Sequence, residues 1–366
     1  MSDISYDPYT AVNLPDPYPL YKRLRDEAPL YYNEEYDFYA VSRYEDCERG
    51  LVDAKRFISG RGGILELIKA NIDFPPGTLI FEDPPAHTVH RSLLSRVFTP
   101  RRVSALEPKI REFCAHSLDP LVGEKEFDLI ADLGQQMPAR VMGMLFGIPD
   151  DGIEKVRRKA DAQLRTTPGQ AMEVSAETTF GSDVYEEYID WRIDHPSDDL
   201  MTELLHTEFE DEYGVTRTLT RDEALLYTTV VSGAGNETTT RLIGWAGKVL
   251  ADNPDQRREL VADRSLLQNA IEELLRYESP GVQIGRYVPE PVELYGQTVP
   301  EGAAMLFIVC AANRDDRRYE DPDRFDIHRT VGQHLAFGYG IHYCLGAALA
   351  RLQGRIALDE LLNRFP

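Results

Sequence analysis

The chain has 366 residues, 42% of them hydrophobic, which is enough to bury a large apolar core. Its 40 basic and 62 acidic residues give a formal net charge of −22. This charge argues against nucleic acid as a partner, because neutralising phosphates requires a basic surface, and it disfavours binding to anionic lipid. The chain starts without the basic and apolar regions of a signal peptide, and its longest apolar run, 303–312, is too short to span a bilayer.

Cysteine usage indicates a reducing compartment. The four cysteines, Cys47, Cys114, Cys310 and Cys344, lie far apart in the sequence and lack the spacing of a zinc finger. Thiols that stay reduced are typical of cytosolic proteins. We therefore expect a cytoplasmic protein without a membrane segment.

The N-terminal third mixes short helices with short strands. A helix is expected to begin at 16–19, and residues 30–32 and 38–41 are predicted to form a β-hairpin. Residues 58–85 are rich in glycine and proline and contain one apolar helical patch, at 64–68. We predict a long functional loop there.

The middle of the chain, 87–275, has an almost entirely helical pattern. Apolar residues recur every three or four positions in segments such as 127–146. The longest helix is expected to start at Thr220, which forms a capping box with Glu223, and to run towards Ala251. About 30 residues at roughly 1.5 Å each give about 45 Å. Since no heptad pattern is sustained, we expect this helix to cross the centre of the protein.

After the helical region the pattern changes to short strands. They are predicted at 283–288, 292–294 and 304–310, and a last helix is predicted at 345–365. The chain is thus expected to be mainly α with small β-sheets, an α+β protein. We expect one domain that spans 1–366.

One ten-residue segment, 337–346, has the most informative sequence. Gly338 and Gly340 allow a tight turn with positive φ just before a cysteine. Gly346 leaves room for a flat ligand against the backbone next to Cys344. A cysteine at the start of a helix favours the thiolate, because free N–H groups and the helix dipole stabilise negative charge there. A lone cysteine beside a glycine turn would more often be an inert core residue.

The whole segment resembles the haem-binding signature of the cytochrome P450 family, aromatic-Gly-x-Gly-x-His-x-Cys-x-Gly, and matches it throughout. The resemblance implies that the Cys344 sulfur binds the iron of haem b. The haem would be held non-covalently, since the chain has no Cys-x-x-Cys-His motif. Within the signature, Phe337, Gly338, His342 and Gly346 would contact the haem.

A second signal is the Glu273-x-x-Arg276 pair. On its own this spacing means little, and Glu154 and Arg157 repeat it. In the family such a pair is buried, takes a partner from a later loop and helps to seat the cysteine loop. We expect the partner within 313–324 and a structural role for the pair.

The long helix carries Ala234-Gly235-Asn236-Glu237-Thr238 in its middle. A glycine costs about 1 kcal/mol against alanine in a helix, which suggests a local opening or a close approach by a ligand. Without further context Glu237 and Thr238 would be polar surface residues. The run matches the family's oxygen-activation motif, which implies that Ala234 and Gly235 lie against the haem. Glu237 and Thr238 would then be catalytic and relay protons to dioxygen.

Four side chains are implied to bind the two haem propionates. His87 and Arg91 lie four residues apart at the start of a helix, where taken alone they would be surface charges. The family uses this His-x-x-x-Arg pair for a propionate, together with the residues that match Arg286 and His342. His90 is expected to face solvent.

The resemblance, of the soluble bacterial kind, implies a haem-thiolate monooxygenase with haem between the long central helix and the cysteine loop with its last helix. It would insert one oxygen atom of O2 into a small, largely apolar substrate, by hydroxylation or oxidative dealkylation. Substrate contacts are expected at 58–80, around 165–172, at Val231 and Ala234, and at 281–284.

A separate protein must supply electrons, because the chain has no flavin or iron–sulfur motif. We expect a ferredoxin-type donor with an NAD(P)H-dependent reductase. Four arginines, Arg96, Arg101, Arg102 and Arg351, could form a basic patch for an acidic donor on the cysteine side. Scattered surface arginines explain them equally well.

Two other functions stay open. One is a peroxide-driven haem-thiolate enzyme, although such relatives usually lack the acid–alcohol pair that Glu237 and Thr238 provide. The other is a haem-binding sensor or carrier without catalysis. The end of the chain at Pro366 keeps this second reading open, because family members normally continue with strands and a hairpin that reaches the substrate pocket. We therefore expect the usual C-terminal strands to be lacking.

Overall fold

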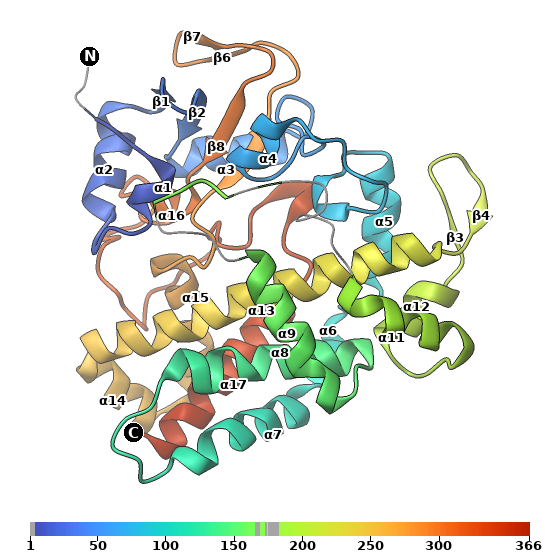
Figure 1. Ribbon diagram of the computed structural model, residues 1–366. Helices are drawn as coiled ribbons and strands as arrows, with labels where there is room; N and C mark the ends of the chain where they lie inside the picture. The colour runs from blue at the N-terminus through green and yellow to red at the C-terminus, as the bar shows by residue number, and fades with distance from the viewer. Residues whose placement is uncertain (1–3, 165–168, 173, 175–182) are drawn as a thin grey trace.

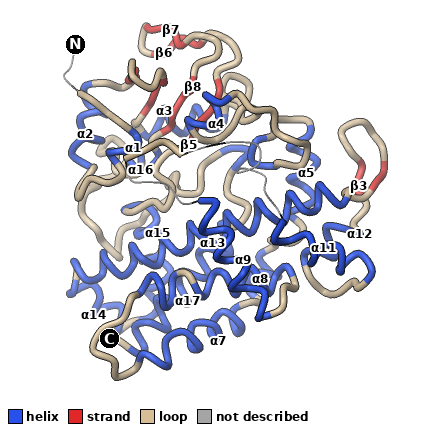
Figure 2. The backbone as a smooth tube through the Cα atoms, in the orientation of Figure 1, coloured by secondary structure: helices blue, strands red, loops and turns tan. Residues whose placement is uncertain are grey.

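The computed structural model describes residues 4–164, 169–172, 174 and 183–366. Helices dominate it, and most of the strands lie together at the top of the view in Figures 1 and 2, above the long helices. This arrangement confirms the predicted α+β class, mainly helical with small sheets. Within the described ranges, no helix is both long and apolar enough to cross a membrane.

Helices and strands alternate mainly in the first and last parts of the chain. The α-helices are α1 (Pro8–Ala11), α2 (Tyr18–Glu27), α3 (Tyr44–Val52), α4 (Leu65–Ala70), α5 (Ala86–Ser95), α6 (Pro100–Ser104), α7 (Glu107–Leu118), α8 (Gln136–Phe146), α9 (Asp150–Leu164), α11 (Asp183–Asp194), α12 (Leu200–His206), α13 (Arg221–Asp252), α14 (Pro254–Ala262), α15 (Leu267–Tyr277), α16 (Val309–Ala312) and α17 (Ala347–Arg364). The strands are β1 (Leu30–Asn33), β2 (Phe38–Val41), β3 (Phe209–Glu210), β4 (Thr216–Arg217), β5 (Ile284–Tyr287), β6 (Val292–Leu294), β7 (Gln297–Val299) and β8 (Ala304–Phe307).

The largest sheet joins the two ends of the chain. Its strand order is β1-β2-β8-β5, and β1 and β2 form the predicted antiparallel hairpin. β8 pairs parallel to β2, with Phe38 opposite Ala304, and antiparallel to β5, with Ile284 opposite Phe307. All four residues of β8 are buried, as expected for a central strand with a neighbour on each side.

The strand predicted at 304–310 is wrong in its second half. β8 ends at Phe307, where the paired segments of both neighbouring strands also end, and the chain then turns into α16. α16 is buried along its whole length. Periodicity cannot separate a buried strand from a buried helical turn in a short apolar run, so only the pairing partners decide where this strand stops.

The long helix α13 crosses the molecule as predicted (yellow in Figure 1). Its 32 residues correspond to about 48 Å. The Thr220 hydroxyl accepts from the Glu223 N–H at 3.2 Å, and the Thr220 N–H donates to the Glu223 carboxylate at 2.8 Å, which confirms the capping box. α13 also packs closely on α17, since a Cβ on Gly354 would lie 2.8 Å from the Leu242 side chain.

The predicted long connection between Ile58 and Pro85 contains α4 and one short 3-10 turn, Leu79–Phe81. Its start attaches to the edge of the sheet, because Ile58 and Tyr287 exchange backbone hydrogen bonds of 3.0 Å. The Asp83 carboxylate then accepts from the backbone N–H groups of Ser59 and Gly60 at 2.9 and 2.8 Å. The loop is therefore closed on itself by a carboxylate near its end.

A substitution at Gly50 tests how tightly α3 packs on β8. A Cβ at this position would lie 2.1 Å from the Phe307 ring, which is itself held edge-on by Phe57 with ring centroids 5.3 Å apart. Gly50→Ala should therefore lower the free energy of unfolding by about 1–3 kcal/mol, although alanine is the better helix former. Chemical denaturation measures this. The control is Gly233→Ala on α13, where the added Cβ would meet no heavy atom within 4 Å; equal stability of the two variants would contradict the packing account.

Candidate active site

The cysteine loop has the conformation that its glycines require. Gly338 and Gly340 have φ of +68° and +73°, in the left-handed region. A Cβ on Gly340 would lie 2.5 Å from the carbonyl oxygen of Leu51, so the loop packs directly against the end of α3. The Cys344 N–H donates to the Phe337 carbonyl at 2.9 Å and closes the loop.

Cys344 lies just before the start of α17, whose N-cap is Gly346. Burial raises the pKa of the Cys344 thiol, while the backbone N–H of Gly346 and the charges of Arg91 and Arg351 lower it. A Cβ on Gly346 would lie 4.0 Å from the sulfur. A glycine at this position therefore leaves space beside the sulfur.

A cavity of about 480 Å³ opens in front of the Cys344 sulfur. It lies between α13 on one side and the cysteine loop with α17 on the other, as predicted. The predicted residues Arg91, Ala234, Gly235, Thr238, Arg286, Phe337, Gly338, His342, Cys344 and Gly346 all line it. The expected substrate-contacting residues Ile64, Ile80, Val231, Gly281 and Ile284 line it as well.

The predicted propionate-binding side chains lie together and lack an acidic partner. The His87 and His342 rings lie 4.2 Å apart between centroids, and Nε2 of each is buried without a hydrogen bond. Arg286 is buried, and its guanidinium donates to the carbonyl of Gly285 at 2.8 Å. Among the described residues, no carboxylate forms an ion pair with Arg286 or Arg91. Such a cluster fits two carboxylates of a bound group.

The pKa values of the four basic groups in this cluster are lowered, chiefly by burial. Burial, followed by the charges of Arg286, His87 and Arg91, lowers the pKa of His342 to about 3. Burial lowers the pKa of Arg286 to about 10, with Asp83 opposing the shift. Burial also lowers the pKa of His87 and of Arg91. Anionic groups placed here would be favoured. The residues present therefore fit a haem with its propionates at this edge.

Glu237 and Thr238 of α13 differ in whether they line the cavity. The Thr238 side chain faces the cavity, and its hydroxyl donates to the Ala234 carbonyl at 2.8 Å. Glu237 forms an ion pair with Arg241 one turn along the helix and lies outside the cavity lining. The two predicted catalytic residues thus occupy the inner and outer sides of one helical turn.

The local opening suggested for α13 is absent, since the described helix runs without interruption from Arg221 to Asp252. Gly235 lines the cavity and also allows close packing of α8, because a Cβ there would lie 2.7 Å from the Met142 sulfur. Ala234, one residue earlier, is exposed to the cavity.

The Glu273–Arg276 pair is completely buried. The guanidinium donates to both carboxylate oxygens, at 2.7 and 2.8 Å. As predicted, it also reaches the later loop, where the carbonyls of Asn313 and Pro322 accept at 2.9 Å each. Two partners lie beyond the predicted range, because the Asp326 N–H and the Arg329 guanidinium donate to Glu273 at 3.0 and 3.1 Å.

His90 does not face solvent, contrary to prediction. Its side chain is 2% exposed and pairs with Glu82. The neighbouring segment supplies a buried carboxylate, which could not be inferred from the helix alone. The substrate segment expected around 165–172 lies partly outside the described residues; within them, the Met172 N–H donates to Glu66 of α4 at 3.1 Å.

Sequence reasoning missed several residues of the cavity wall. Tyr227 and Leu242 line it together with the predicted residues Val231, Ala234 and Thr238. All five are spaced three or four residues apart along α13. This spacing is that of one helical face, so it could have identified Tyr227 and Leu242 once Thr238 was placed. Leu94 and Phe98, at and just beyond the end of α5, carry no comparable sequence signal.

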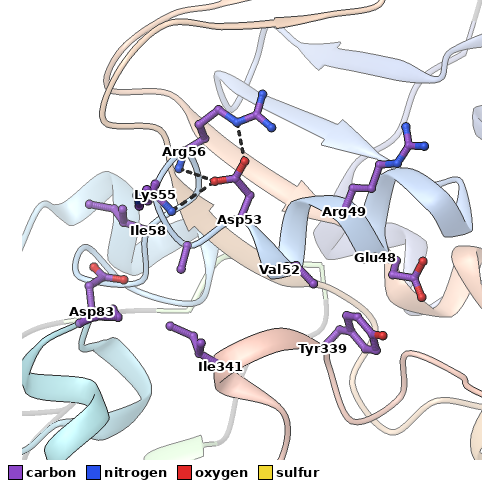
Figure 3. A pocket seen from close by; sticks show the side chains of 12 residues that line it. Glu48, Arg49, Val52, Asp53, Lys55, Arg56, Ile58, Asp83, Tyr339 and Ile341 are labelled. Atoms are coloured by element: carbon purple, nitrogen blue, oxygen red, sulfur yellow. Dashed lines mark hydrogen bonds and ion pairs between the residues drawn. The ribbon is translucent and has the colours of Figure 1, made fainter.

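A larger hollow of about 950 Å³ lies on the outer side of the cysteine loop (Figure 3). Tyr339 and Ile341 of the loop form one side of it, and the end of α3 with the segment after it forms the other. Asp53 accepts there from the backbone N–H groups of Lys55 and Arg56 at 3.3 and 3.1 Å. Cys344 lines the smaller cavity and not this hollow, so the smaller one is the candidate active site.

Comparisons with known proteins show which family the chain belongs to. The family model described as Cytochrome P450 matches residues 177–366. The putative cytochrome P450 123 of Mycobacterium tuberculosis is 36% identical over 367 residues, which cover 99% of this chain and 90% of that protein. The chain belongs to the cytochrome P450 family. Cytochrome P450 107B1 of Saccharopolyspora erythraea is 39% identical over 344 residues, 90% of this chain and 82% of that protein.

Solved cytochrome P450 structures have the same fold. One from Chondromyces apiculatus gives a TM-score of 0.83 at 34% identity, covering 97% of this chain and 89% of that one. One from Bacillus megaterium, solved in complex with testosterone, gives 0.83 at 30% identity, covering 96% and 90%. As a cytochrome P450, the protein is a haem-dependent monooxygenase. The family and fold inferred from the ten-residue signature are confirmed.

Glu273→Ala should lower the free energy of unfolding by about 3–5 kcal/mol, because it leaves the buried Arg276 charge without its counter-ion. Glu154→Ala removes a pair of the same spacing in which the Glu154 side chain is 44% exposed, and should cost less than about 1 kcal/mol. Urea denaturation of both variants measures the difference. Similar losses in the two would contradict a special role for the buried pair.

Proposed function

We propose that Cys344 is the haem ligand of this cytochrome P450 and that Thr238 and Glu237 serve its reaction with dioxygen. One observation carries the proposal: the Cys344 sulfur and the Thr238 side chain line the same cavity from opposite elements, the start of α17 and the middle of α13. Haem b, when bound, supplies the activation of dioxygen. Haem would contact Ala234, Gly235, Phe337, Gly338 and Gly346.

The chain's own groups would hold the haem at its edge and its face. His87, Arg91, Arg286 and His342 would bind the propionates. Nε2 of His87 and of His342 is buried without a hydrogen bond, and the hydrogen bonds of the two arginines go to backbone carbonyls, of Tyr343 and Gly285. The Gly346 N–H and the charges of Arg91 and Arg351 would stabilise the Cys344 thiolate.

Proton transfer would run across one turn of α13. Glu237 lies on the outer side with Arg241, where it can exchange protons with solvent. The Thr238 hydroxyl points into the cavity and donates to the Ala234 carbonyl, so it can pass a proton inward and be held between transfers.

The substrate is proposed to be a largely apolar organic molecule that undergoes hydroxylation or oxidative dealkylation. Leu79, Ile80, Phe81, Val231 and Ile284 give the cavity an apolar wall. Relatives solved with testosterone and with erythromycin B show that the fold accepts ligands of very different size. The substrate's identity therefore depends on this wall more than on the fold.

Electrons are proposed to come from a ferredoxin-type protein with an NAD(P)H-dependent reductase. Arg96 and Arg101 are exposed at the end of α5 and in α6. Arg102 and Arg351 already form ion pairs, with Glu203 at 2.6 Å and with Glu272 at 2.6 Å. An acidic donor would thus meet a smaller basic patch than the four arginines predict.

Thr238→Ala and Thr238→Ser test the proton relay. A compound that shifts the Soret band of the haem protein is first selected from an apolar panel. With a ferredoxin and its reductase, Thr238→Ala should consume NADPH but form at least about tenfold less product per NADPH, because the hydroxyl is missing. Thr238→Ser should stay near wild type. Wild-type product formed as fast from hydrogen peroxide alone would instead favour the peroxide-driven alternative.

A further inference from the structure

Glu82 and His90 form a buried pair beside the cavity that has no part in the function proposed above. The His90 side chain is 2% exposed and that of Glu82 is 10% exposed. Nδ1 of His90 lies 2.9 and 2.8 Å from the two carboxylate oxygens. With a proton on Nδ1, the ring donates to the carboxylate, because an ionised carboxylate only accepts hydrogen bonds. Taking both groups out of water costs free energy that this contact has to offset.

The Glu82 carboxylate also closes a turn of the cavity wall. The backbone N–H of Gly77 donates to its Oε1 at 2.7 Å. Between these two residues lie Leu79, Ile80 and Phe81, and all three line the cavity. Gly77 has φ of +98°, so the turn starts at a backbone position that few other residues adopt. One carboxylate therefore ties the first residue of the turn to the last.

His90 fixes this carboxylate from the helical side of the molecule. It belongs to α5, and its ring packs edge-on against Tyr227 of α13, with centroids 5.8 Å apart at 82°. Phe209 of β3 packs against it at 6.2 Å. A Cβ on Gly77 would lie 3.7 Å from Tyr227, so the turn itself rests on α13. The position of Glu82 is thus set by elements that also shape the cavity.

The neighbouring carboxylate, Asp83, holds the other end of the same loop. Its hydrogen bonds to Ser59 and Gly60 fix the segment that leads to the cavity residues Gly63 and Ile64. Asp83 is satisfied by backbone N–H groups within the loop. Glu82 is the one of the two that is tied to a helix, and this tie depends on a single imidazole.

We propose that Glu82 and His90 are positioning residues that hold the wall at 79–81 and so determine how large a substrate the cavity accepts. The inference rests on the proposed function of the cavity as the haem and substrate site. Loss of the pair would affect a ligand that reaches the wall and would spare one that occupies only the space next to the haem iron.

His90→Asn and His90→Leu separate the hydrogen bond from side-chain volume. Asparagine places an amide N–H near the position of Nδ1 and can still donate to Glu82, whereas leucine has no donor. His328→Leu is the control, because His328 forms the same kind of pair with Glu259, at 2.8 Å on the surface, with both side chains at least half exposed.

The probes are imidazole and 4-phenylimidazole. Both bind haem iron through a ring nitrogen and shift its Soret band, and only the second extends into the cavity. In His90→Leu, the Kd of 4-phenylimidazole should rise by about five- to twentyfold, while that of imidazole should change by less than about twofold. In His90→Asn and His328→Leu, both Kd values should stay within about twofold of wild type.

Amide hydrogen exchange of residues 75–82 in the haem-loaded protein gives a readout without a ligand. Exchange of the Gly77 N–H should be faster in His90→Leu than in His90→Asn. Equal weakening of both probes, unchanged binding of both, or His90→Asn as weak as His90→Leu would each overturn the proposal. If His90→Leu does not fold, Glu82→Leu against Glu82→Gln makes the same comparison. A wild-type protein that shows no Soret shift with either probe would count against the proposed function instead.

Discussion

A cysteine sulfur that binds haem iron has to be buried, kept anionic and left open on one side, and most of the structure around the cavity follows from these requirements. Two left-handed glycines turn the chain so that Cys344 arrives at the start of α17. There the Gly346 N–H and two nearby arginines counteract the cost of burying negative charge. The loop packs so closely on α3 that a Cβ at Gly340 would lie 2.5 Å from the Leu51 carbonyl oxygen.

The loop's support is a buried network whose members satisfy each other. Arg276 donates five hydrogen bonds: two to Glu273 and one each to the carbonyls of Asn313, Pro322 and Arg324. A guanidinium has five N–H donors, so none is left over. Glu273 in turn accepts from Arg329 and from the Asp326 N–H. A buried charge is tolerable only when it is this fully paired, which is why one partner cannot be removed cheaply.

Sequence reasoning succeeded where the information is local. The cysteine signature places all its determinants within ten residues, and the glycines fix the backbone by themselves. The capping box at Thr220 is local in the same way. His90 could not be placed, because its environment is made by a carboxylate eight residues earlier and by α13, more than a hundred residues later. Arg329 was missed because its contact to Glu273 spans 56 residues.

The end of the sheet shows the same limit. The run 303–312 is uniformly apolar, and only the lengths of β2 and β5 determine where β8 stops.

That residues 1–366 make one domain and that the protein is cytoplasmic both remain predictions.

The most direct test of the central claim is the carbon monoxide difference spectrum of the reduced, haem-loaded protein, recorded for the wild type and for Cys344→Ala. Thiolate ligation by Cys344 predicts a strongly red-shifted Soret band in the wild type that is lost in the variant. A band at the same red-shifted position in both proteins would show that another residue binds the iron. An unshifted band in the wild type would show that the ligand is not a thiolate, and either result would contradict the account.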